Sequence, residues 1–417
     1  MKFNRAFVNV IGCGFAGIEC ALFLAGHGIK VHLFDSKRNG TYKSCDYKSD
    51  FSEKREINEV LLRQELSLLG SPLIKAEREL LSQGISDDLP SRLLEIGREM
   101  VKHNENIEFF EASVNEVNPK EVTIIATGPK TDEGLYEYLL TNLGYMRCYN
   151  HMPIYPVLQK IDESNLISNG NDKEYLYLPL DYSSYIDFIN HIVKGLNSEI
   201  NDKNFVLKEN TMEELVNRGK DNLKNYAMMP LLLNGVKERP YAVLKLRKTE
   251  NGLRLEDICS KFDIVNQLEV FSSLEGFEKS IIKKKADMLD VCYLNSRYVV
   301  NEFHQCHQNE NLFFAGSILG IEGYVDCIAS GIYTALNVNK YFNEKLMIPM
   351  PKNTCIGSLA KTVISVVGTR PLPFIEDYGV IQIAGGEGVD ELVSKAYNRS
   401  VEALAKYKED YKNGKSI

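Results

Sequence analysis

The spacing of apolar and polar residues divides the chain into short strands and amphipathic helices. The first apolar run, residues 8–11, leads directly into G-C-G-F-A-G at residues 12–17 and then into an apolar helix over 18–25. A second apolar run at 30–34 ends at Asp35. A strand, a glycine-rich turn, a helix and a second strand ending in an acidic residue are typical of the βαβ unit that binds dinucleotides. The alternative is a glycine turn in an unrelated α/β protein.

Each residue of this unit has an expected task. Gly12 permits the tight turn, Gly14 lets the backbone approach a pyrophosphate, and Gly17 lets the helix pack closely on the strand. The helix N-terminus attracts the anion through its free N–H groups and its dipole. Asp35 has about the ~20-residue spacing of an acid that binds ribose. The expected cofactor contacts here are Gly12, Gly14, Phe15, Ala16, Gly17 and Asp35.

The pattern continues as an α/β domain. Residues 39–56 are polar, rich in tyrosine and long for a connection, so we expect them to work at a site. Helical spacing of apolar residues predicts helices over 59–69 and 90–103. Apolar runs at 107–110 and 121–126 predict strands, and the second ends in Thr127-Gly128-Pro129. Small residues there let the backbone come close to a cofactor, so Thr127 and Gly128 join the candidate contacts.

A second domain interrupts this fold. From about residue 150 to 300 strands and helices follow one another without a glycine fingerprint, for example at 175–178 and 241–246. We interpret the chain as residues 1–150 and 301–417 forming a cofactor-binding domain, with 151–300 as an inserted α+β domain. A last amphipathic helix is predicted over 389–411, where packing is the favoured use of its apolar stripe.

The glycine pattern returns late in the chain. Residues 311–320 read as a strand entering a glycine turn, followed by E-G-Y and a helix. A nucleotide fold built from both ends of the chain is the usual plan of two-dinucleotide-fold flavoproteins, in which the late turn lines the flavin half of FAD. The predicted fold is therefore an FAD-binding Rossmann domain of this type. The further expected contacts are Gly316, Ser317, Gly320, Glu322, Gly323 and Tyr324.

Composition narrows the function classes. No run of the 417 residues approaches the ~18 apolar residues of a membrane helix, and no signal peptide is recognised, so we expect a cytoplasmic protein without a membrane partner. The nine cysteines form no C-x-x-C pair, which indicates neither a metal site nor a disulfide framework. A net charge of −8 argues against an indiscriminate nucleic-acid coat but leaves room for a local basic face.

Segments along almost the whole chain resemble the folate- and FAD-dependent RNA (uracil-5-)methyltransferases, the TrmFO (Gid) family. The most specific are A-T-G-P at 126–129 and E-G-Y-V at 322–325, whereas the glycine fingerprint is shared with many flavoproteins, including the related GidA (MnmG) group. Further matching segments are L-G-S-P-L-I-K-A at 69–76, M-P-I at 152–154, R-P-Y-A-V at 239–243, I-G-S-L at 356–359 and D-Y-G at 377–379.

The resemblance implies a reduced flavin that passes a one-carbon unit from methylenetetrahydrofolate to carbon 5 of a uridine, with NAD(P)H as reductant. This chemistry requires a thiolate that adds to carbon 6 of the uracil and a base that removes the proton from carbon 5. The family uses two cysteines for these tasks. Cys45 falls near the first.

The second family cysteine is missing. In the matching segment, 208–219, Glu209 or Asn210 stands at its place, so Glu209 is the candidate base. A carboxylate can accept a proton, but it is a poor substitute for a thiol that adds to the ring. The family's A-G-Q turn also reads Ala315-Gly316-Ser317, which shortens a side chain beside the flavin.

Three hypotheses follow. The first is an active 5-methyluridine methyltransferase whose substrate is tRNA or, with a changed target, 23S rRNA. The second is an FAD-binding oxidoreductase or folate oxidase with a changed reaction. The third is a non-catalytic paralogue that binds flavin as structure. The sequence favours the first, and it leaves the oligomeric state open.

Overall fold

The computed structural model describes residues 6–36, 52–85, 89–144, 147–168, 175–199, 205–236, 238–249, 251–365 and 389–413. Contacts between residues divide the chain into two units. The first combines the N-terminal part, up to residue 150, with the C-terminal part from residue 291 on. The second consists essentially of residues 151–290.

A five-stranded parallel sheet forms the centre of the first unit, in the order β12-β4-β1-β2-β3. From β1 the chain builds β2 and β3 on one side, and β4 and β12 are added on the other. In an open α/β sheet the crevice beside such a reversal, at the carboxyl ends of the strands, is where ligands bind. The strands are β1 (Val8–Ile11), β2 (Val31–Asp35), β3 (Ile107–Glu111), β4 (Thr123–Ile125) and β12 (Leu312–Phe314).

Helices pack around this sheet. The helix α1 (Phe15–Gly26) is buried from Phe15 to Ala25 and lies beside α11 (Tyr324–Phe342). At their crossing a Cβ on Gly331 would lie 2.7 Å from the carbonyl oxygen of Ala16, so the two backbones are in contact. The other elements are α2 (Ser52–Leu69), α3 (Pro72–Ser82), α4 (Leu89–Lys102), η1 (Gly128–Lys130), α5 (Glu133–Leu143), α10 (Ser296–Val299), η3 (Gly316–Leu319), α12 (Cys355–Ser365) and α13 (Val389–Asn413).

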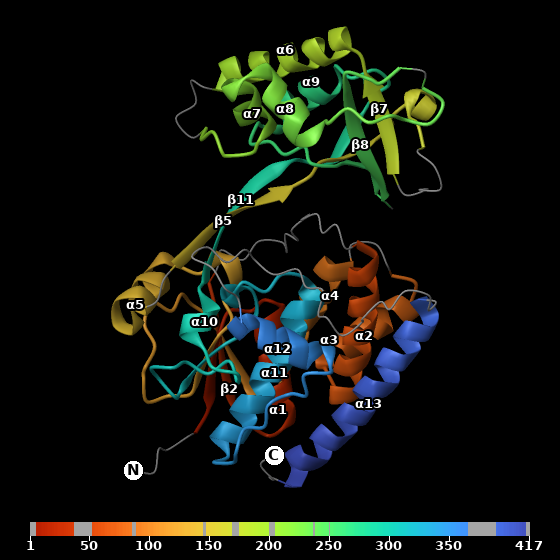
Figure 1. The fold of residues 1–417 in the computed structure, drawn as a ribbon. Helices are drawn as coiled ribbons and strands as arrows, with labels where there is room; N and C mark the ends of the chain where they lie inside the picture. Colours follow the sequence, from red (N-terminus) through yellow and green to blue (C-terminus); the bar gives the residue numbers. More distant parts are fainter. Residues whose placement is uncertain are drawn as a thin grey trace. The chain divides into compact units, whose positions relative to one another are not determined.

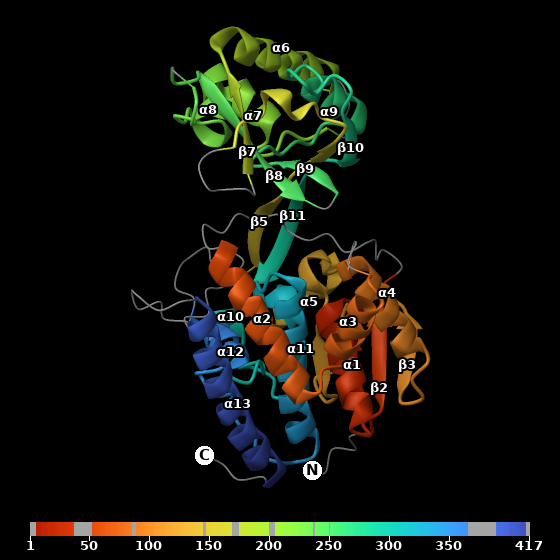
Figure 2. The same ribbon diagram turned by 90° about the vertical axis from the view of Figure 1, so that its right-hand side faces the viewer.

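The long C-terminal helix α13 belongs to this unit although it is remote in sequence. Figures 1 and 2 show α13 running alongside α2. Its Ala396, Leu404 and Tyr407 are buried in the same core as β1 and α1. Packing is therefore the use of its apolar stripe, as the pattern predicted.

The second unit has its own core between an antiparallel sheet and a group of helices. The strand order is β10-β6-β9-β8-β7, and the helices cover one face of the sheet (Figure 1). Alternate residues such as Leu244 and Leu246 point to these helices. The strands are β6 (Val157–Gln159), β7 (Tyr175–Leu180), β8 (Ala242–Thr249), β9 (Gly252–Leu255) and β10 (Ile281–Lys284). The helices are η2 (Glu163–Asn165), α6 (Tyr182–Glu199), α7 (Met212–Arg218), α8 (Lys220–Ala227) and α9 (Ile264–Phe271).

Two strands connect the units. The chain enters the second unit along β5 (Arg147–Ile154) and returns along β11 (Asp287–Leu294), and these two strands pair with each other.

The parallel sheet with its strand-turn-helix start confirms the predicted α/β Rossmann-type fold. Some elements differ from the prediction. The helix predicted over 59–69 begins at Ser52, the strand predicted over 121–126 is limited to Thr123–Ile125, and α3 and α5 were not predicted. Within the described ranges no helix is both long and apolar enough to cross a membrane.

Candidate functional site

The turn after β1 is built from backbone groups that leave no room for side chains. Gly12 has φ +106°, and its N–H donates to the carbonyl oxygen of Phe34 at 2.7 Å. A Cβ on Gly12 would lie 2.5 Å from the carbonyl oxygen of Ala126, and one on Gly17 would lie 1.9 Å from that of Gly12. Only glycine fits at both positions, which brings β1, α1 and the end of β4 into direct contact.

Gly14 is different because a Cβ there would meet no atom of the described protein within 4 Å. Gly14 is the N-cap of α1, and no side chain at this position caps the N–H groups of the first turn. The N–H groups and the positive dipole end at the start of this 12-residue helix favour an anion at this place. Packing within the described residues therefore does not require a glycine at this position.

Asp35 ends β2 beside this turn. Its Oδ1 accepts a hydrogen bond from the backbone N–H of Cys13 at 3.1 Å. A small pocket opens here at the carboxyl ends of β1, β2, β3 and β4, and its lining includes Gly12, Asp35, Val114 and Thr127. The structure thus brings Asp35 together with the fingerprint glycines across β1 and β2.

The A-T-G turn after β4 closes the other side of this pocket. Gly128 has φ +67°, and its carbonyl oxygen accepts a hydrogen bond from Thr131 Oγ1 at 2.9 Å. The hydroxyls of Thr127 and Thr131 are hydrogen-bonded to each other at 2.5 Å. Thr127 and Gly128 are therefore held in place at the carboxyl edge of the sheet.

The late glycine turn reaches the same helix from the other direction. Gly316 has φ +75°, its N–H donates to Ser330 Oγ at 2.9 Å, and a Cβ on it would lie 2.8 Å from Cβ of Ala16. Ser317 Oγ lies 3.3 Å from Cys327 Sγ. The first turn of α1 and the turn before α11 are consequently packed together, although 300 residues separate Ala16 from Gly316.

The end of that turn leads into α11. Gly320 and Gly323 have φ of +82° and +91°, and Gly323 is the N-cap of the helix. Glu322 between them is buried. Glycine suits both positions because side chains disfavour this left-handed backbone region.

Tyr324 belongs to a cluster that the sequence did not indicate. Its hydroxyl donates to Glu77 Oε1 and accepts from Arg63 Nη2, both at 2.7 Å, and its ring lies 5.4 Å from that of Phe15. Arg63 also pairs with Glu77 and Glu59 at 3.2 Å. Burial raises the pKa of the Tyr324 hydroxyl. This ring, predicted to face the cofactor, is thus fixed beside the first turn of α1.

A pattern in the sequence could have pointed to this cluster. Glu59 and Arg63 are four residues apart on one helix, a spacing that favours an ion pair. Glu77 lies on the apolar side of α3, where its side chain is only 1% exposed. A charged residue on a buried helical face requires a partner, but the sequence alone does not say which one.

The two catalytic candidates fall elsewhere. Cys45 lies outside the described residues. Glu209 is exposed and belongs to the second unit, just before Asn210, whose φ is +63°. Four residues further, Glu213 at the start of α7 is fully buried, and burial raises its pKa to about 7. Its Oε1 accepts from the N–H of Lys261 at 2.6 Å, so this carboxyl belongs to the core of its unit.

Six thiols are buried, those of Cys13, Cys20, Cys259, Cys306, Cys327 and Cys355. Burial raises the pKa of Cys13 to about 12, with a further contribution from nearby Asp35. The pKa values of Cys20, Cys259, Cys327 and Cys355 are raised in the same way. Because the thiolate is the nucleophile, none of these five suits attack on a substrate.

The chain has relatives along most of its length. A family model described as "Glucose inhibited division protein A" matches residues 7–346. The methylenetetrahydrofolate–tRNA-(uracil-5-)-methyltransferase TrmFO of Acetivibrio thermocellus is 28% identical, in an alignment that covers 90% of this chain and 92% of the relative. The protein of the same name from Thermotoga maritima is 27% identical over 97% of this chain and 99% of its own length.

Solved structures show the same fold. GidA of Aquifex aeolicus, in its form II crystal, matches with a TM-score of 0.60 at 15% identity, over 99% of this chain and 74% of that chain. The form I crystal of the same protein gives a TM-score of 0.61.

Proposed function

Because the chain belongs to the family of glucose inhibited division protein A, we propose that it is a flavin- and folate-dependent methyltransferase acting on carbon 5 of uridine in RNA. The match to relatives named for this reaction, over nine-tenths or more of the chain, carries the proposal. The names of these relatives favour transfer RNA as the substrate. Ribosomal RNA is the alternative target, because the inserted unit differs from the family pattern around residues 208–219.

The residues at the carboxyl edge of the sheet fit FAD. Gly14 leaves open space at the N-terminus of α1 where a pyrophosphate can approach, while Gly12 and Gly17 allow the turn that creates this space. Asp35 faces the adjoining pocket, where it would bind ribose hydroxyls. The flavin, when bound and reduced by NAD(P)H, supplies the chemistry that transfers the one-carbon unit.

The late turn would hold the flavin half. Gly316, Gly320 and Gly323 keep side chains off the backbone there, and Ser317 adds a short hydroxyl. Arg63 and Glu77 fix the hydroxyl of Tyr324, so the ring keeps one orientation beside Phe15. We therefore assign Tyr324 to the wall of the flavin site and the Arg63–Glu77 pair to its positioning.

The substrate chemistry needs a thiolate and a base. We propose that the thiolate of Cys45 adds to carbon 6 of the uracil, which makes carbon 5 nucleophilic. After carbon 5 has taken the one-carbon unit, Glu209 removes the proton from carbon 5, the C5–C6 double bond forms again and the Cys45 thiolate leaves. The exposed position of Glu209 leaves its carboxylate accessible to a large RNA substrate.

One experiment tests the function. The purified protein is incubated with NAD(P)H, methylenetetrahydrofolate labelled in its methylene carbon, and tRNA or rRNA from cells that lack the protein. We expect label in 5-methyluridine of tRNA, its loss in C45A, and a rate at least about tenfold lower in E209Q. E214Q, which changes a neighbouring glutamate paired with Arg218, is the matched control.

The alternatives predict different results. Label found in rRNA alone would show that rRNA, and not tRNA, is the substrate. Rapid NAD(P)H oxidation by oxygen that RNA does not affect, with no labelled RNA, would indicate an oxidoreductase with a changed reaction. A bound flavin that NAD(P)H cannot reduce would indicate a non-catalytic paralogue.

A further inference from the structure

A second pocket of the first unit, of about 300 Å³, lies where four helices end. Its lining includes His27 at the C-cap of α1, Leu69 at the end of α2, Asn343 at the C-cap of α11 and Lys412 in the last turn of α13. His27 is at the opposite end of α1 from Gly14. The pocket is therefore separate from the proposed FAD site.

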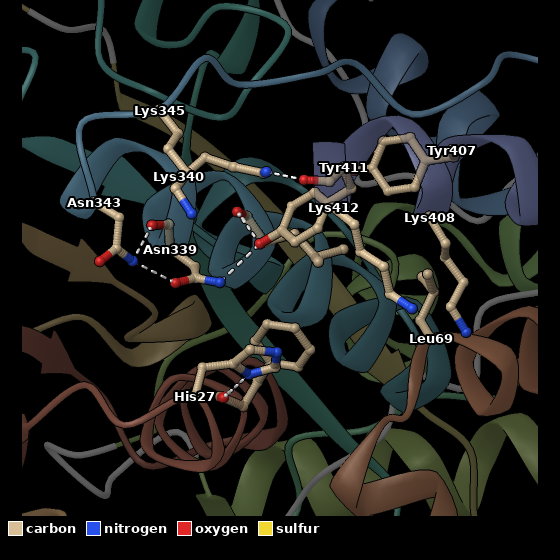
Figure 3. Close-up of a pocket in the computed structure, with 12 residues that line it drawn as sticks. His27, Leu69, Asn339, Lys340, Asn343, Lys345, Tyr407, Lys408, Tyr411 and Lys412 are labelled. Carbon is tan, nitrogen blue, oxygen red and sulfur yellow. Dashed lines mark hydrogen bonds between the residues drawn. The ribbon is translucent and has the colours of Figure 1, made fainter. Parts of the chain in front are cut away.

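Four lysines line this pocket, and its described lining contains no carboxylate (Figure 3). Two of the four have structural partners. Lys340 donates to the carbonyl oxygen of Tyr411, and Lys408 donates to that of Leu68 at 2.9 Å. These two bonds satisfy carbonyl groups at the ends of α13 and α2, which a helix leaves without partners.

Lys345 and Lys412 do not bond to helix-end carbonyl groups of the described residues in this way. Both are exposed, and neither ammonium group is bonded to any residue in the described ranges. Burial, and to a smaller extent the positive charge of Lys345, lowers the pKa of Lys340. Two ammonium groups thus remain available to a ligand.

The helix ends do not cancel this charge. Each helix C-terminus is equivalent to roughly −0.5 charge, so the four ends contribute about −2 against +4 from the lysines. The excess of about +2 matches one phosphate monoester, which carries about −1.5 to −2 charge at pH 7.

Apolar and aromatic groups complete the lining. The rings of Phe23 and His27 are stacked with their centroids 4.2 Å apart, and Leu69 and Tyr407 add further apolar surface. Leu69, Lys408 and Lys412 line the same pocket, so charged and apolar groups both face a ligand there. Such a lining suits an organic group attached to the phosphate better than a bare ion.

We propose that this pocket binds a small organic phosphate, attracted by the positive charge of Lys345 and Lys412, with the aromatic wall against the organic part. Nothing in this proposal depends on the methyltransferase activity. A phosphate of the RNA backbone shares the same chemistry, and the test must separate it from a small ligand.

The test is calorimetric titration of the FAD-loaded protein with ribose 5-phosphate, with inorganic phosphate and unphosphorylated ribose as comparisons. We expect saturable binding of ribose 5-phosphate at one site, weaker binding of inorganic phosphate, and none of ribose. K345Q/K412Q should weaken the binding about tenfold. K361Q/K406Q changes two exposed lysines outside the pocket and should leave the affinity for ribose 5-phosphate unchanged.

Three outcomes overturn the proposal. The first is the absence of saturable heat with ribose 5-phosphate, and the second is an equal loss of binding in both double variants. The third is a loss of tRNA affinity in K345Q/K412Q when ribose 5-phosphate does not bind, which would make the pocket a contact for the RNA backbone. The flavin absorbance of each variant checks that the fold is intact.

Discussion

At the scale of single residues, Gly14 separates ligand binding from folding. A Cβ at Gly14 meets no protein atom within 4 Å, so G14A should fold with a loss of at most about 1 kcal/mol. The new methyl group would occupy the space of the pyrophosphate, and we expect FAD affinity to fall at least about tenfold. Flavin fluorescence titration of the apoprotein measures this.

Two other glycines of α1 serve as comparisons for G14A. G26A also meets nothing within 4 Å, and it should bind FAD normally and gain about 0.5–1 kcal/mol from the helix. G17A places its Cβ 1.9 Å from a carbonyl oxygen and should impair folding itself. Normal FAD affinity in G14A would show that Gly14 does not contact the cofactor.

The buried glutamate Glu77 makes Arg63 essential to the first unit. R63M would leave a carboxylate that is 1% exposed without its cation, and we expect a loss of about 3 kcal/mol in the free energy of unfolding. E59Q removes the partly exposed partner of the same arginine and should change stability by less than about 1 kcal/mol. Denaturant unfolding of both variants decides this, and equal small losses would contradict the proposed dependence.

The buried carboxyl of Glu213 should make the free energy of unfolding depend on pH. Burial raises its pKa to about 7 from an ordinary value of 4.5, so the folded state holds the proton more tightly than the unfolded state. The carboxyl therefore destabilises the fold increasingly as pH rises from about 4.5 to 7. E213Q should be more stable than the wild type by about 3 kcal/mol at pH 8 and by little at pH 5.

The control for E213Q is E209Q, a change at an exposed glutamate in the preceding turn. It should shift stability by less than about 0.5 kcal/mol at either pH. A gain in E213Q that does not depend on pH would show that the carboxyl is not the cause.

The sequence predicted the glycines and Asp35 but not the residues that surround them. Gly12 and Gly17 follow from a spacing that backbone geometry enforces, and each has no room for a Cβ. Arg63 and Glu77 meet Tyr324 across more than 240 residues of sequence. Only tertiary packing brings residues so distant in sequence into contact, so no local sequence pattern predicts that Arg63 and Glu77 bond to Tyr324.

At the scale of elements, the segment Gly70-Ser71-Pro72 both ends one helix and begins the next. Gly70-Ser71-Pro72 correctly predicts the end of a helix at Leu69, but Ser71 and Pro72 also begin the next helix. Ser71 Oγ accepts from the N–H of Ile74 at 3.2 Å, and Pro72 stands at the first helical position, where its missing N–H costs nothing. The helix α3 was therefore missed although its start signal was present.

Helix α12 is held by a carboxylate from another helix. Glu65 of α2 accepts from the N–H groups of Cys355 at 2.8 Å and Ile356 at 3.0 Å, and from Ser400 Oγ of α13 at 2.7 Å. E65Q would replace one accepting oxygen by a donating amide, and we expect a loss of about 2 kcal/mol in the free energy of unfolding. S365A, at the exposed end of α12, should lose less than about 0.5 kcal/mol.

Hydrogen exchange can locate the effect of E65Q. The first amides of α12 should exchange faster in E65Q than in the wild type, because they lose their acceptor. Unchanged exchange at Cys355 and Ile356 would argue against the cap.

At the scale of the whole molecule, the two units have separate hydrophobic cores. The core of the first unit includes β1, α1, α11 and α13, and the core of the second is formed by its own sheet and helices. Units with separate cores can unfold separately. FAD, in the proposed site, binds only the first unit, and a ligand stabilises the unit that binds it.

Scanning calorimetry of the protein with and without FAD tests this separation. We expect two transitions, of which only one moves to higher temperature as FAD is added, by an amount that grows with the logarithm of its concentration. At pH 8, E213Q should raise the other transition, because Glu213 lies in the core of the second unit. R63M should lower the FAD-sensitive transition. A single transition that responds to FAD, E213Q and R63M alike would show that the two cores unfold as one cooperative unit.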